Sequence, residues 1–216
     1  QVAQTWAQGA RDFHARDLSP DMTRLLRNWS AEVRHIQSLL DLIQGEDCLS
    51  LRGTGRRPVA RPVDTVVLLS PVPSPSSLRD FYSFEQHVKT VYEMRDREVP
   101  AEWYEQPTFY YANPYTIMLP EQGVAPPRNC HALDYELEIA CVIGRAGRDI
   151  SPEAAPNYIA GYMIMNDWSA RDIQRKEMRI GLGPAKGKDF ATSLGPVLVT
   201  PDELTDRQIG DGADLR

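Results

Sequence analysis

The sequence predicts an α+β, β-rich fold, and three observations support this prediction. Short runs of alternating or wholly apolar residues, which are typical of strands, occupy 133–144, 158–167 and 194–200. Apolar residues at helical spacing are confined to a few other segments, so there is little helix between the strands. The chain has 216 residues, of which 42% are hydrophobic and 25% are charged, and this is an ordinary globular composition.

The N-terminal part, 1–75, is predicted to be a small region of helix and strand. Apolar residues between 21 and 45 recur at helical spacing, which predicts a helix. The apolar run Val63–Leu69 predicts a strand. The stretch PVPSPSS at 71–77 holds three prolines, so it predicts a rigid linker and a domain boundary, after which 76–216 forms a second domain.

The second domain is predicted to start with a helix at 80–94, with Asp80 at its N-cap or in its first turn. The following stretch, 95–132, mixes prolines with aromatic residues and predicts loops and short strands. Beyond the strand at 133–144, the sequence predicts a short helix at 151–159 with Ser151 as its N-cap, a helix at 169–179 and a glycine-rich loop at 181–190.

Overall charge and cysteine content limit the classes of function. A formal net charge of -6 argues against nucleic-acid binding, because no basic stripe is available to neutralise phosphates. No apolar run approaches the length of a membrane span. Cys48, Cys130 and Cys141 form no CxxC pair, and Cys141 is predicted to be a buried thiol. The sequence therefore predicts a reduced, cytoplasmic protein without nucleic-acid or membrane partners.

The strand LDYELEIACVIG at 133–144 places a carboxylate at every second position. Asp134, Glu136 and Glu138 share one face, because successive side chains of a strand point to opposite faces. Either water covers this face or a cation lies on it. The same face continues with small or apolar residues, which are Ala140, Val142 and Gly144. Because buried ionised carboxylates are costly unless they are paired or metal-bound, the pattern favours a hard divalent cation with oxygen ligands.

Two further motifs place charged residues next to predicted strands. In NDWSARD, Asp167 ends an apolar run, where site residues often lie, and Arg171 follows four residues later. In isolation, a helix N-cap with a surface ion pair is the better interpretation of this motif. The loop GLGPAKGKDF lacks the spacing and the Ser or Thr of a phosphate-binding loop. Its two lysines, Lys186 and Lys188, either reach toward an anion or lie on a solvated turn.

One of the four histidines, His87, falls seven residues after Asp80. A lone histidine is more often structural or exposed than catalytic. On a helix, however, a spacing of seven places the two side chains on roughly the same face, which would bring a base close to a hydrogen-bond acceptor.

Four blocks of sequence together resemble one known family. The chain resembles the fumarylacetoacetate hydrolase (fumarylacetoacetase) family in four blocks, both in their order and in their residues. The blocks are DFYSFEQH, DYELEIA, NDWSARDIQ and GPAKGKDFATSLGP. The resemblance runs from about Val63 to about Leu204. It implies a mixed β-roll, preceded by a smaller N-terminal region. It also implies that the domain is truncated at its C-terminal end, because the family continues past the last residue of this chain.

The resemblance implies roles for individual residues. A Mg²⁺ or Ca²⁺ ion is held by four carboxylates, which are Asp80, Glu136, Glu138 and Asp167. The catalytic groups are His87, as the base that activates water, and the oxyanion-holding residues Lys188, Arg171 and Gln174. The substrate-contacting positions are Tyr82 and Thr192.

The implied reaction is metal-dependent hydrolysis of a carbon–carbon bond in a 1,3-diketone acid, such as fumarylacetoacetate or an acylpyruvate. Two alternatives stay open: an isomerase, hydratase or decarboxylase that uses the same metal-enolate chemistry, and a non-catalytic binding domain with a vestigial metal site. His87 favours hydrolysis, because it supplies water with a base. The expected partners are a small carboxylic-acid substrate and a second copy of the chain in a homodimer. Met178 departs from the family tyrosine near that point, which leaves the identity of the substrate open.

Overall fold

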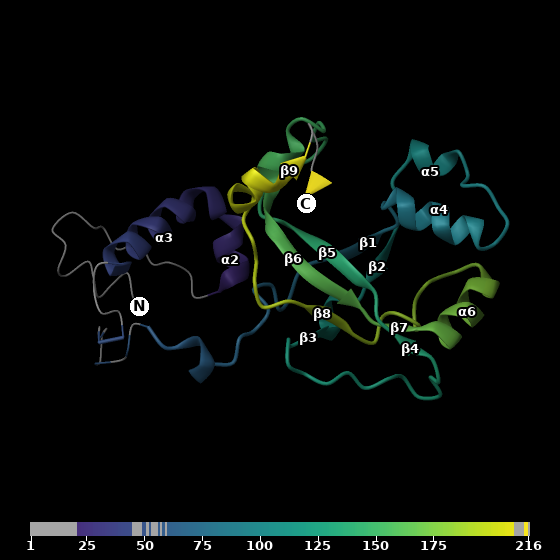
Figure 1. The fold of residues 1–216 in the computed structure, drawn as a ribbon, viewed down its shortest axis with the longest axis horizontal. Helices are drawn as coiled ribbons and strands as arrows, with labels where there is room; N and C mark the ends of the chain where they lie inside the picture. The colour runs from purple at the N-terminus through teal and green to yellow at the C-terminus, as the bar shows by residue number, and fades with distance from the viewer. Residues whose placement is uncertain are drawn as a thin grey trace. The chain divides into compact units, whose positions relative to one another are not determined.

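The computed structural model describes residues 21–44, 49–50, 52, 56, 58, 60–209 and 214–215, so Cys48 lies outside the described residues. Helices and short strands are both present, which confirms the predicted α+β class (Figure 1). The α-helices are α2 (Met22–Arg27), α3 (Trp29–Gln44), α4 (Glu85–Glu93), α5 (Glu102–Glu105) and α6 (Arg171–Ile180), and the 3-10 helices are η2 (Val63–Thr65), η3 (Pro114–Thr116), η4 (Ala155–Tyr158) and η5 (Pro201–Arg207). In this part of the chain, no helix has the length and apolar character that a bilayer crossing requires.

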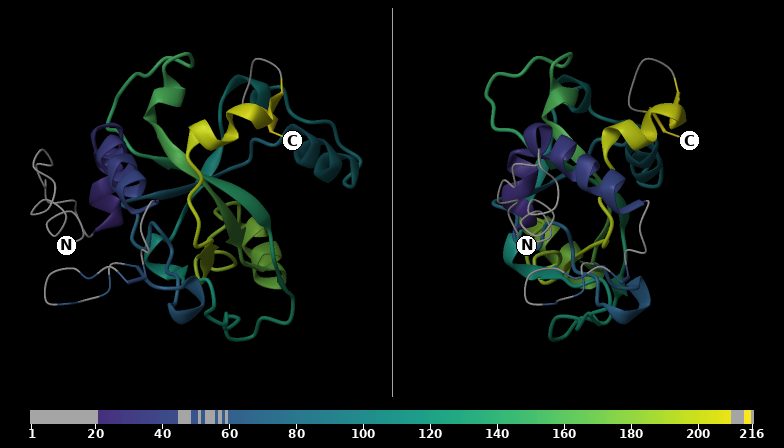
Figure 2. Two further views of the ribbon diagram at one scale, coloured as in Figure 1. Left: turned by 60° about the vertical axis from the view of Figure 1, so that its left-hand side comes forward. Right: turned by 90° about the vertical axis from the view of Figure 1, so that its left-hand side faces the viewer.

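The strands form small sheets. They are β1 (Leu78–Phe81), β2 (Phe109–Ala112), β3 (Ile117–Met118), β4 (Leu133–Asp134), β5 (Leu137–Ile143), β6 (Ile159–Asp167), β7 (Ser169–Ala170), β8 (Thr192–Leu194), β9 (Gln208–Ile209) and β10 (Asp214–Leu215). The largest sheet has the order β3-β8-β6-β5, with β3 parallel and β6 antiparallel to β8. Strands β5 and β6 run side by side in Figures 1 and 2. The other sheets are the antiparallel pairs β1-β2, β4-β7 and β9-β10.

By its internal contacts, the chain divides into two compact units. The first unit consists of Gln1–Val72, Ile139–Ile164 and Gly195–Arg216, and the second consists of Pro73–Glu138 and Met165–Leu194. The second unit contains every residue to which the sequence assigned a catalytic, substrate-binding or metal-binding role. The division into domains at 1–75 and 76–216 stays a prediction.

Two helices, α2 and α3, occupy the stretch 21–45 that was predicted to be helical. The side chain of Asp21 caps α2 by accepting a backbone N–H two residues further on, at 2.9 Å. Leu25 and Leu26 are buried, as expected for the apolar face of an amphipathic helix. The helical path is interrupted at Asn28, the C-cap of α2, whose amide donates to the carbonyls of Leu25 and Leu26.

The strand predicted at Val63–Leu69 is wrong. The segment begins instead with the 3-10 turn η2, because the amide and the hydroxyl of Thr65 both bond back to the carbonyl of Pro62, at 3.0 and 2.7 Å. No strand pairs with this segment among the described residues, and Val63 and Val67 are each 68% exposed. An apolar run without a neighbouring strand gains no ladder hydrogen bonds, so apolar character alone was misleading here.

The helix predicted at 80–94 is only partly correct. Its first residues form β1, which pairs with β2, and the helix α4 begins at Glu85. Asp80 is therefore a strand residue opposite Tyr110 and not a helix cap, and it shares no helical face with His87. The side chain of Val88 is fully buried and anchors α4. The pairing with β2 outweighs the weak helical preference of this short segment, and its aromatic residues suit a strand.

The acidic strand is present but interrupted. Tyr135 and Glu136 lie between β4 and β5, and β4 pairs with β7. The apolar face of β5 is the exposed one, with Leu137 at 72% and Ile139 at 65%, whereas Glu138 is half-buried. Cys141 shares that exposed face, so the prediction of a buried thiol is wrong.

The remaining predicted elements are partly confirmed. Strand β6 and helix α6 lie where they were predicted, and α6 ends at Gly181, which has a left-handed φ of 81°. The short helix predicted at 151–159 is reduced to the 3-10 turn η4, whose N-cap is Ala154. Of the strand predicted at 194–200, only Leu194 belongs to β8. Pairing with β6 continues beyond it in isolated steps, because the Gly195 amide donates to the Ile164 carbonyl at 2.8 Å and Val199 forms a single antiparallel bridge with Tyr162. Pro196, which has no N–H to donate, lies between these two contacts.

Candidate metal centre

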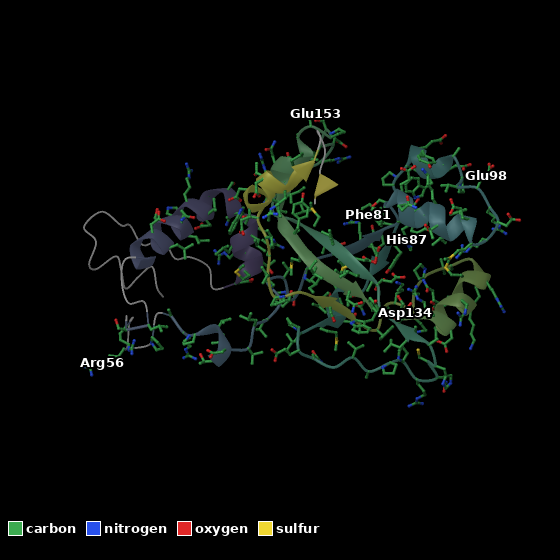
Figure 3. All side chains as sticks on the ribbon, in the orientation of Figure 1. Arg56, Phe81, His87, Glu98, Asp134 and Glu153 are labelled. Carbon is green, nitrogen blue, oxygen red and sulfur yellow. The ribbon has the colours of Figure 1, made fainter. Side chains whose placement is uncertain are left out.

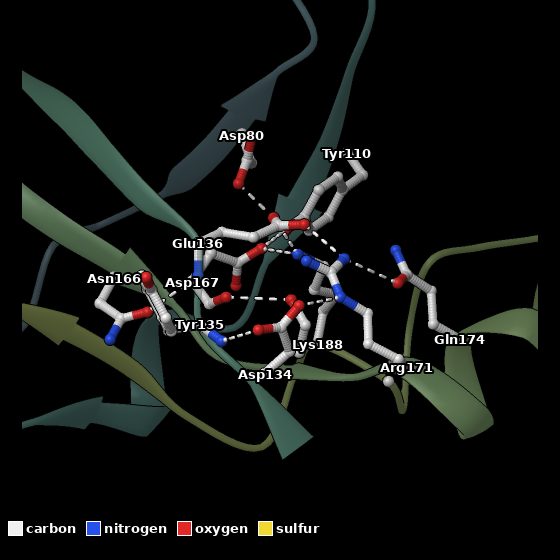
Figure 4. Close-up of polar contacts among 12 residues, drawn as sticks. Asp80, Tyr110, Asp134, Tyr135, Glu136, Asn166, Asp167, Arg171, Gln174 and Lys188 are labelled. Atoms are coloured by element: carbon white, nitrogen blue, oxygen red, sulfur yellow. Dashed lines mark hydrogen bonds and ion pairs between the residues drawn. The ribbon is translucent and has the colours of Figure 1, made fainter. Parts of the chain in front are cut away.

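Three carboxylates from three strands converge in the second unit. Asp80 of β1, Glu138 of β5 and Asp167 of β6 each offer one oxygen, and these oxygens all lie within 4.8 Å of one another. In Figure 4, Asp80 and Asp167 approach the same region from separate strands. Carboxylate oxygens at this spacing can bind one divalent cation together after small rotations of their side chains.

Backbone pairing fixes the positions of two of these carboxylates. Asp80 lies opposite Tyr110 in the ladder between β1 and β2. Asp167 ends β6, opposite Thr192 of β8, and its carbonyl accepts a hydrogen bond from the Ser169 hydroxyl at 3.0 Å. The side chains of Asp167, Ser169 and Thr192 are all buried. Strands therefore hold the carboxylates, which is how a preorganised site is built.

Burial changes the acidity of the three carboxyl groups. It raises the pKa of Asp80 above its ordinary value, the pKa of Asp167 to about 6 and the pKa of Glu138 to about 8. For Glu138, the negative charges of Asp80 and Asp167 raise the pKa further. For Asp167, the ammonium group of Lys188 opposes the effect of burial on the pKa. One buried and two half-buried carboxylates this close together require cations in order to be ionised together.

One oxygen of Asp167 shows that the cluster fits a cation. Its Oδ2 atom contacts the hydroxyl of Tyr110 and the ammonium of Lys188. Its Oδ1 atom is buried and has no hydrogen-bond partner within the described part of the chain. A buried carboxylate oxygen without a donor is rare, because leaving it unpaired costs about 1–3 kcal/mol or more. All-oxygen donors of this kind suit Mg²⁺ or Ca²⁺.

Glu136, the fourth predicted ligand, lies outside this group of three. Its carboxylate is ion-paired with Lys188 and Arg171. Burial raises the pKa of Glu136, but the two cations lower it by more, so the pKa lies below its ordinary value. Its backbone is pinned between β4 and β5: its amide donates to Asn166 Oδ1 at 3.1 Å, and its carbonyl accepts from the Asp167 amide at 3.0 Å. That Glu136 binds the metal stays a prediction.

Lys188 is the cation at the centre of the site. Its side chain is only 4% exposed, and its Nζ atom donates to Glu136 Oε2 and to Asp167 Oδ2. The two acceptors belong to different strands or strand junctions, so the ammonium joins them (Figure 4). A buried lysine that is ion-paired with a carboxylate of the candidate metal centre is placed to stabilise a developing negative charge.

A second cation, Arg171, extends the polar network. It is the first residue of α6, and its Nε atom donates to Asp134 Oδ2 at 2.9 Å while Nη1 contacts Glu136. The same Nη1 donates to Gln174 Oε1 at 3.2 Å, one turn along the helix. The sequence suggested Asp167 as a partner of Arg171, whereas its observed partners are Asp134 and Glu136. Figure 4 shows the guanidinium group between these side chains.

Comparisons with known proteins agree with this geometry. The family model described as fumarylacetoacetate (FAA) hydrolase C-terminal matches residues 77–216, which is well over half of the chain. The chain belongs to the fumarylacetoacetate hydrolase family. The match includes all of the carboxylates and cations described above.

Individual relatives show how far the similarity extends. The chain is 28% identical to fumarylacetoacetase of Dictyostelium discoideum, over 89% of this chain and 49% of that protein. It is 35% identical to human fumarylacetoacetase, over 58% of this chain and 34% of the human protein. Among solved structures, a probable 2-hydroxyhepta-2,4-diene-1,7-dioate isomerase from Mycobacterium abscessus is 27% identical, with a TM-score of 0.54, over 85% of this chain and 56% of the other. The chain spans about half, or less, of the length of these curated relatives.

The fumarylacetoacetate hydrolase resemblance assigned roles to three residues that lie at the edge of this network. His87 is exposed on α4, and its ring meets the edge of the Tyr82 ring with the centroids 5.7 Å apart (Figure 3). The carbonyl of Tyr82 accepts from the Trp103 indole at 2.6 Å, which fixes the chain between β1 and α4. Thr192 lies next to Asp167 in the sheet. Among the described residues, the His87 side chain has no hydrogen-bond or ion-pair partner, so its role stays a prediction.

Sequence reasoning missed one residue of the centre, Tyr110. Its hydroxyl contacts Asp80 Oδ2 at 3.0 Å and also Asp167 Oδ2, and burial beside these two acids raises its pKa. A hydroxyl carries one proton, so only one of these contacts is donated by Tyr110 at a time. The alternation in TFYYA, with Tyr110 on the inner face between two outer aromatic residues, was the signal in the sequence.

The raised pKa of Glu138 predicts a pH-dependent metal affinity. With a pKa of about 8, Glu138 is protonated at neutral pH in the metal-free protein, so a bound cation must displace this proton. We expect the affinity for Mg²⁺ to rise by up to about tenfold per pH unit as the pH approaches about 8, and to level off above that value. Titration calorimetry at pH 7, in two buffers of different ionisation enthalpy, should report release of about one proton per ion.

The pH dependence of the stability of the metal-free protein tests the same raised pKa of Glu138 without a metal. A carboxyl group with a raised pKa binds more protons in the folded than in the unfolded state between the two pKa values. For Glu138 this window extends up to about pH 8, so its contribution to the free energy of unfolding falls as the pH rises through that window. An affinity for Mg²⁺ that does not change over this range would contradict the assignment of Glu138 as a ligand.

Proposed function

We propose that the protein is a metal-dependent hydrolase that cleaves a carbon–carbon bond in a 1,3-diketone acid, such as fumarylacetoacetate or an acylpyruvate. The main support is the buried carboxylate of Asp167, which has one oxygen without a hydrogen-bond partner among the described residues and the other bound to Lys188. This arrangement combines an open ligand for a hard cation with a fixed ammonium group. Membership of the fumarylacetoacetate hydrolase family gives independent support for this reaction class.

The chemistry divides among the residues as follows. Asp80, Glu138 and Asp167 would hold Mg²⁺ or Ca²⁺, which supplies Lewis-acid stabilisation of negative charge on the diketone oxygens. His87 takes a proton from water, whose oxygen forms a bond to the acyl carbon. The carbon–carbon bond then breaks, its electron pair stays on the leaving carbon as an enolate, and a proton from the base completes the second acid.

The cations of the network have separate tasks in this proposal. Lys188 lies at the carboxylates of Glu136 and Asp167, where its ammonium stabilises the developing oxyanion. Arg171 and Gln174 are hydrogen-bonded to each other, so they present guanidinium and amide donors together. Tyr82 and Thr192 contact the substrate. These tasks require a carboxylic acid with several oxygens, so the proposed substrate class carries a net negative charge.

One observation favours a second candidate function. The similar structure from Mycobacterium abscessus is described as a probable isomerase, and a metal-stabilised enolate serves isomerisation as well as hydrolysis. The exposed position of His87, without a polar partner among the described residues, is compatible with either reaction. An isomerase needs no base for water, so the two candidates differ in their dependence on His87.

A comparison of His87→Gln with the wild type separates the two candidates. The full-length protein is assayed with added Mg²⁺ against a panel of diketone acids and unsaturated keto acids, by loss of diketone absorbance and by product analysis. We expect wild-type hydrolysis to fall by about 10²–10⁴-fold in His87→Gln, while enolate formation, followed by deuterium exchange, persists. Hydrolysis that survives the substitution would remove the proposed role of His87. Metal binding without turnover of any panel member would favour a non-catalytic binding domain.

Location and assembly are also proposals. We propose a cytoplasmic location, because the three cysteines form no CxxC pair, and a homodimer, as the resemblance to the family implies. Size-exclusion chromatography with light scattering on the full-length protein measures the oligomeric state.

A further inference from the structure

A carboxylate outside the metal centre binds the backbone of the loop that carries Lys188. Glu177 lies on α6, and its two carboxylate oxygens accept three consecutive backbone N–H groups, from Ala185 at 3.1 Å, Lys186 at 2.6 Å and Gly187 at 3.0 Å. Consecutive amides that point at one anion form a nest, which usually binds a ligand such as phosphate. Here the anion is a side chain of the same chain, and the next residue is Lys188.

The loop is fixed against α6 by further contacts. The carbonyl of Gly187 accepts from the Ala170 amide at 2.8 Å, just before the helix. A Cβ atom on Gly187 would lie 2.9 Å from the backbone and the Cβ atom of Gln174, so only glycine allows this approach. The amide of Lys188 turns back to the carbonyl of Ala185 at 2.8 Å. The backbone of Lys188 is therefore held from one side by α6 and from the other by its own turn.

The charge of Glu177 is maintained by the nest. Burial raises the pKa of this carboxyl, but the three backbone N–H groups and the nearby Lys186 outweigh burial, so the pKa lies below its ordinary value. Glu177 is thus ionised at neutral pH, and hydrogen bonds to a charged acceptor are stronger than those between neutral groups. None of the roles assigned above uses Glu177, although it makes more backbone contacts to this loop than any catalytic residue does.

We propose that Glu177 is a positioning residue: by binding the amides of 185–187, it holds the Lys188 ammonium at Glu136 and Asp167. A lysine side chain has four rotatable bonds, so its reach does not by itself define where the ammonium lies. A fixed backbone origin restricts the ammonium to the carboxylates of the centre. A misplacement of about 1 Å at a catalytic group can cost about 100-fold in rate. The inference rests on the proposed function, in which Lys188 stabilises an oxyanion.

Two substitutions at Glu177 test this proposal in the full-length, metal-loaded protein. Glu177→Ala removes all three acceptors, and we expect kcat to fall by about 10–100-fold while KM and the dissociation constant for Mg²⁺ change by less than about twofold. Glu177→Gln keeps one amide oxygen, so it should retain more activity than the alanine variant, with a loss of about 3–10-fold. Lys176→Ala, an exposed residue of the same helix, is the matched control and should keep the wild-type kcat.

A second measurement does not depend on turnover. The rate at which an amine-specific reagent modifies Lys188, followed by peptide mass spectrometry, reports how firmly its ammonium is held. In the wild type, a side chain that is 4% exposed and ion-paired should react slowly, and in Glu177→Ala we expect the rate to increase about tenfold or more. Lys186, which is exposed, provides an internal reference on the same peptide region.

The outcomes separate the two proposals. A wild type that turns over no substrate while Glu177→Ala still accelerates the modification of Lys188 would remove the proposed function and leave the positioning role intact. Unchanged kcat and an unchanged modification rate in Glu177→Ala would overturn the positioning role. If Glu177→Ala fails to fold, as judged by its thermal unfolding, then the kcat and the Lys188 modification rate of Glu177→Gln decide instead. A loss in kcat together with an equal loss in metal affinity would show a general structural defect and would also overturn the proposal.

Discussion

Asp167→Asn is expected to abolish metal binding and turnover together. Among the described residues, Oδ1 of Asp167 is buried without a hydrogen-bond partner, and its Oδ2 atom is bound by Lys188. The amide of asparagine has the same shape but carries no charge and offers one acceptor oxygen in place of two. Residues that only orient metal ligands typically contribute 10–100-fold to affinity, so the loss of a direct ligand should exceed about 100-fold.

The measurement is titration calorimetry with Mg²⁺ and Ca²⁺, together with loss of diketone absorbance under saturating metal. Asp64→Asn, at an exposed aspartate of η2, is the control and should bind metal like the wild type. If Asp167→Asn binds the cation with unchanged affinity, then the three carboxylates do not form the centre. The chelator-treated wild type should behave like Asp167→Asn in the assay, because both lack the bound cation.

Replacing Lys188 by methionine is expected to remove turnover while leaving metal binding intact. Methionine is unbranched and one atom shorter than lysine, so the change removes mainly the ammonium. Loss of one preorganised oxyanion-stabilising donor typically costs about 10²–10³-fold in kcat. The metal should bind at least as tightly as in the wild type, because the substitution removes a positive charge that competes for Glu136 and Asp167.

The stability of Lys188→Met gives a second test. Without the ammonium, two carboxylates lose a cationic partner in a largely buried place, which typically costs about 3–5 kcal/mol when one member of a buried ion pair is removed. We therefore expect the metal-free variant to unfold at a lower temperature, and added Mg²⁺ to recover more stability than it does in the wild type. The matched control is Lys186→Met on the same loop, which is exposed. Equal kcat values for Lys188→Met and the wild type would exclude Lys188 from the reaction.

Much of the centre could be predicted from single segments of sequence. The alternation of carboxylates at 133–144 predicted that Glu136 and Glu138 lie on one face, and the apolar run before Asp167 predicted its place at the end of a strand. Both inferences depend on local periodicity, which a short window of sequence contains. The resemblance to the family added Asp80 and Lys188, and the structure brings both to the carboxylates.

What the sequence could not supply depends on contacts between distant segments. Asp80 was predicted on a helix, because β1 has only four residues and its partner β2 lies almost thirty residues further on. The pairing of Glu136 with Lys188 joins residues 52 apart, and no periodic pattern reports such a pair. The same reason hid Tyr110, whose hydroxyl meets Asp167 only after two separate ladders have formed.

The three clustered carboxylates also affect how firmly two sheets of the protein are joined. Asp80 belongs to the β1-β2 sheet, whereas Glu138 and Asp167 belong to the four-stranded sheet, and the two sheets are separate in their backbone pairing. Without an ion, Tyr110 and Lys188 hold this junction through their contacts with Asp167. A bound cation would act there as a cross-link between the two sheets. Chelation should therefore loosen the β1-β2 sheet as well as stop the reaction, and amide exchange in β1 and β2 should quicken when the metal is withdrawn.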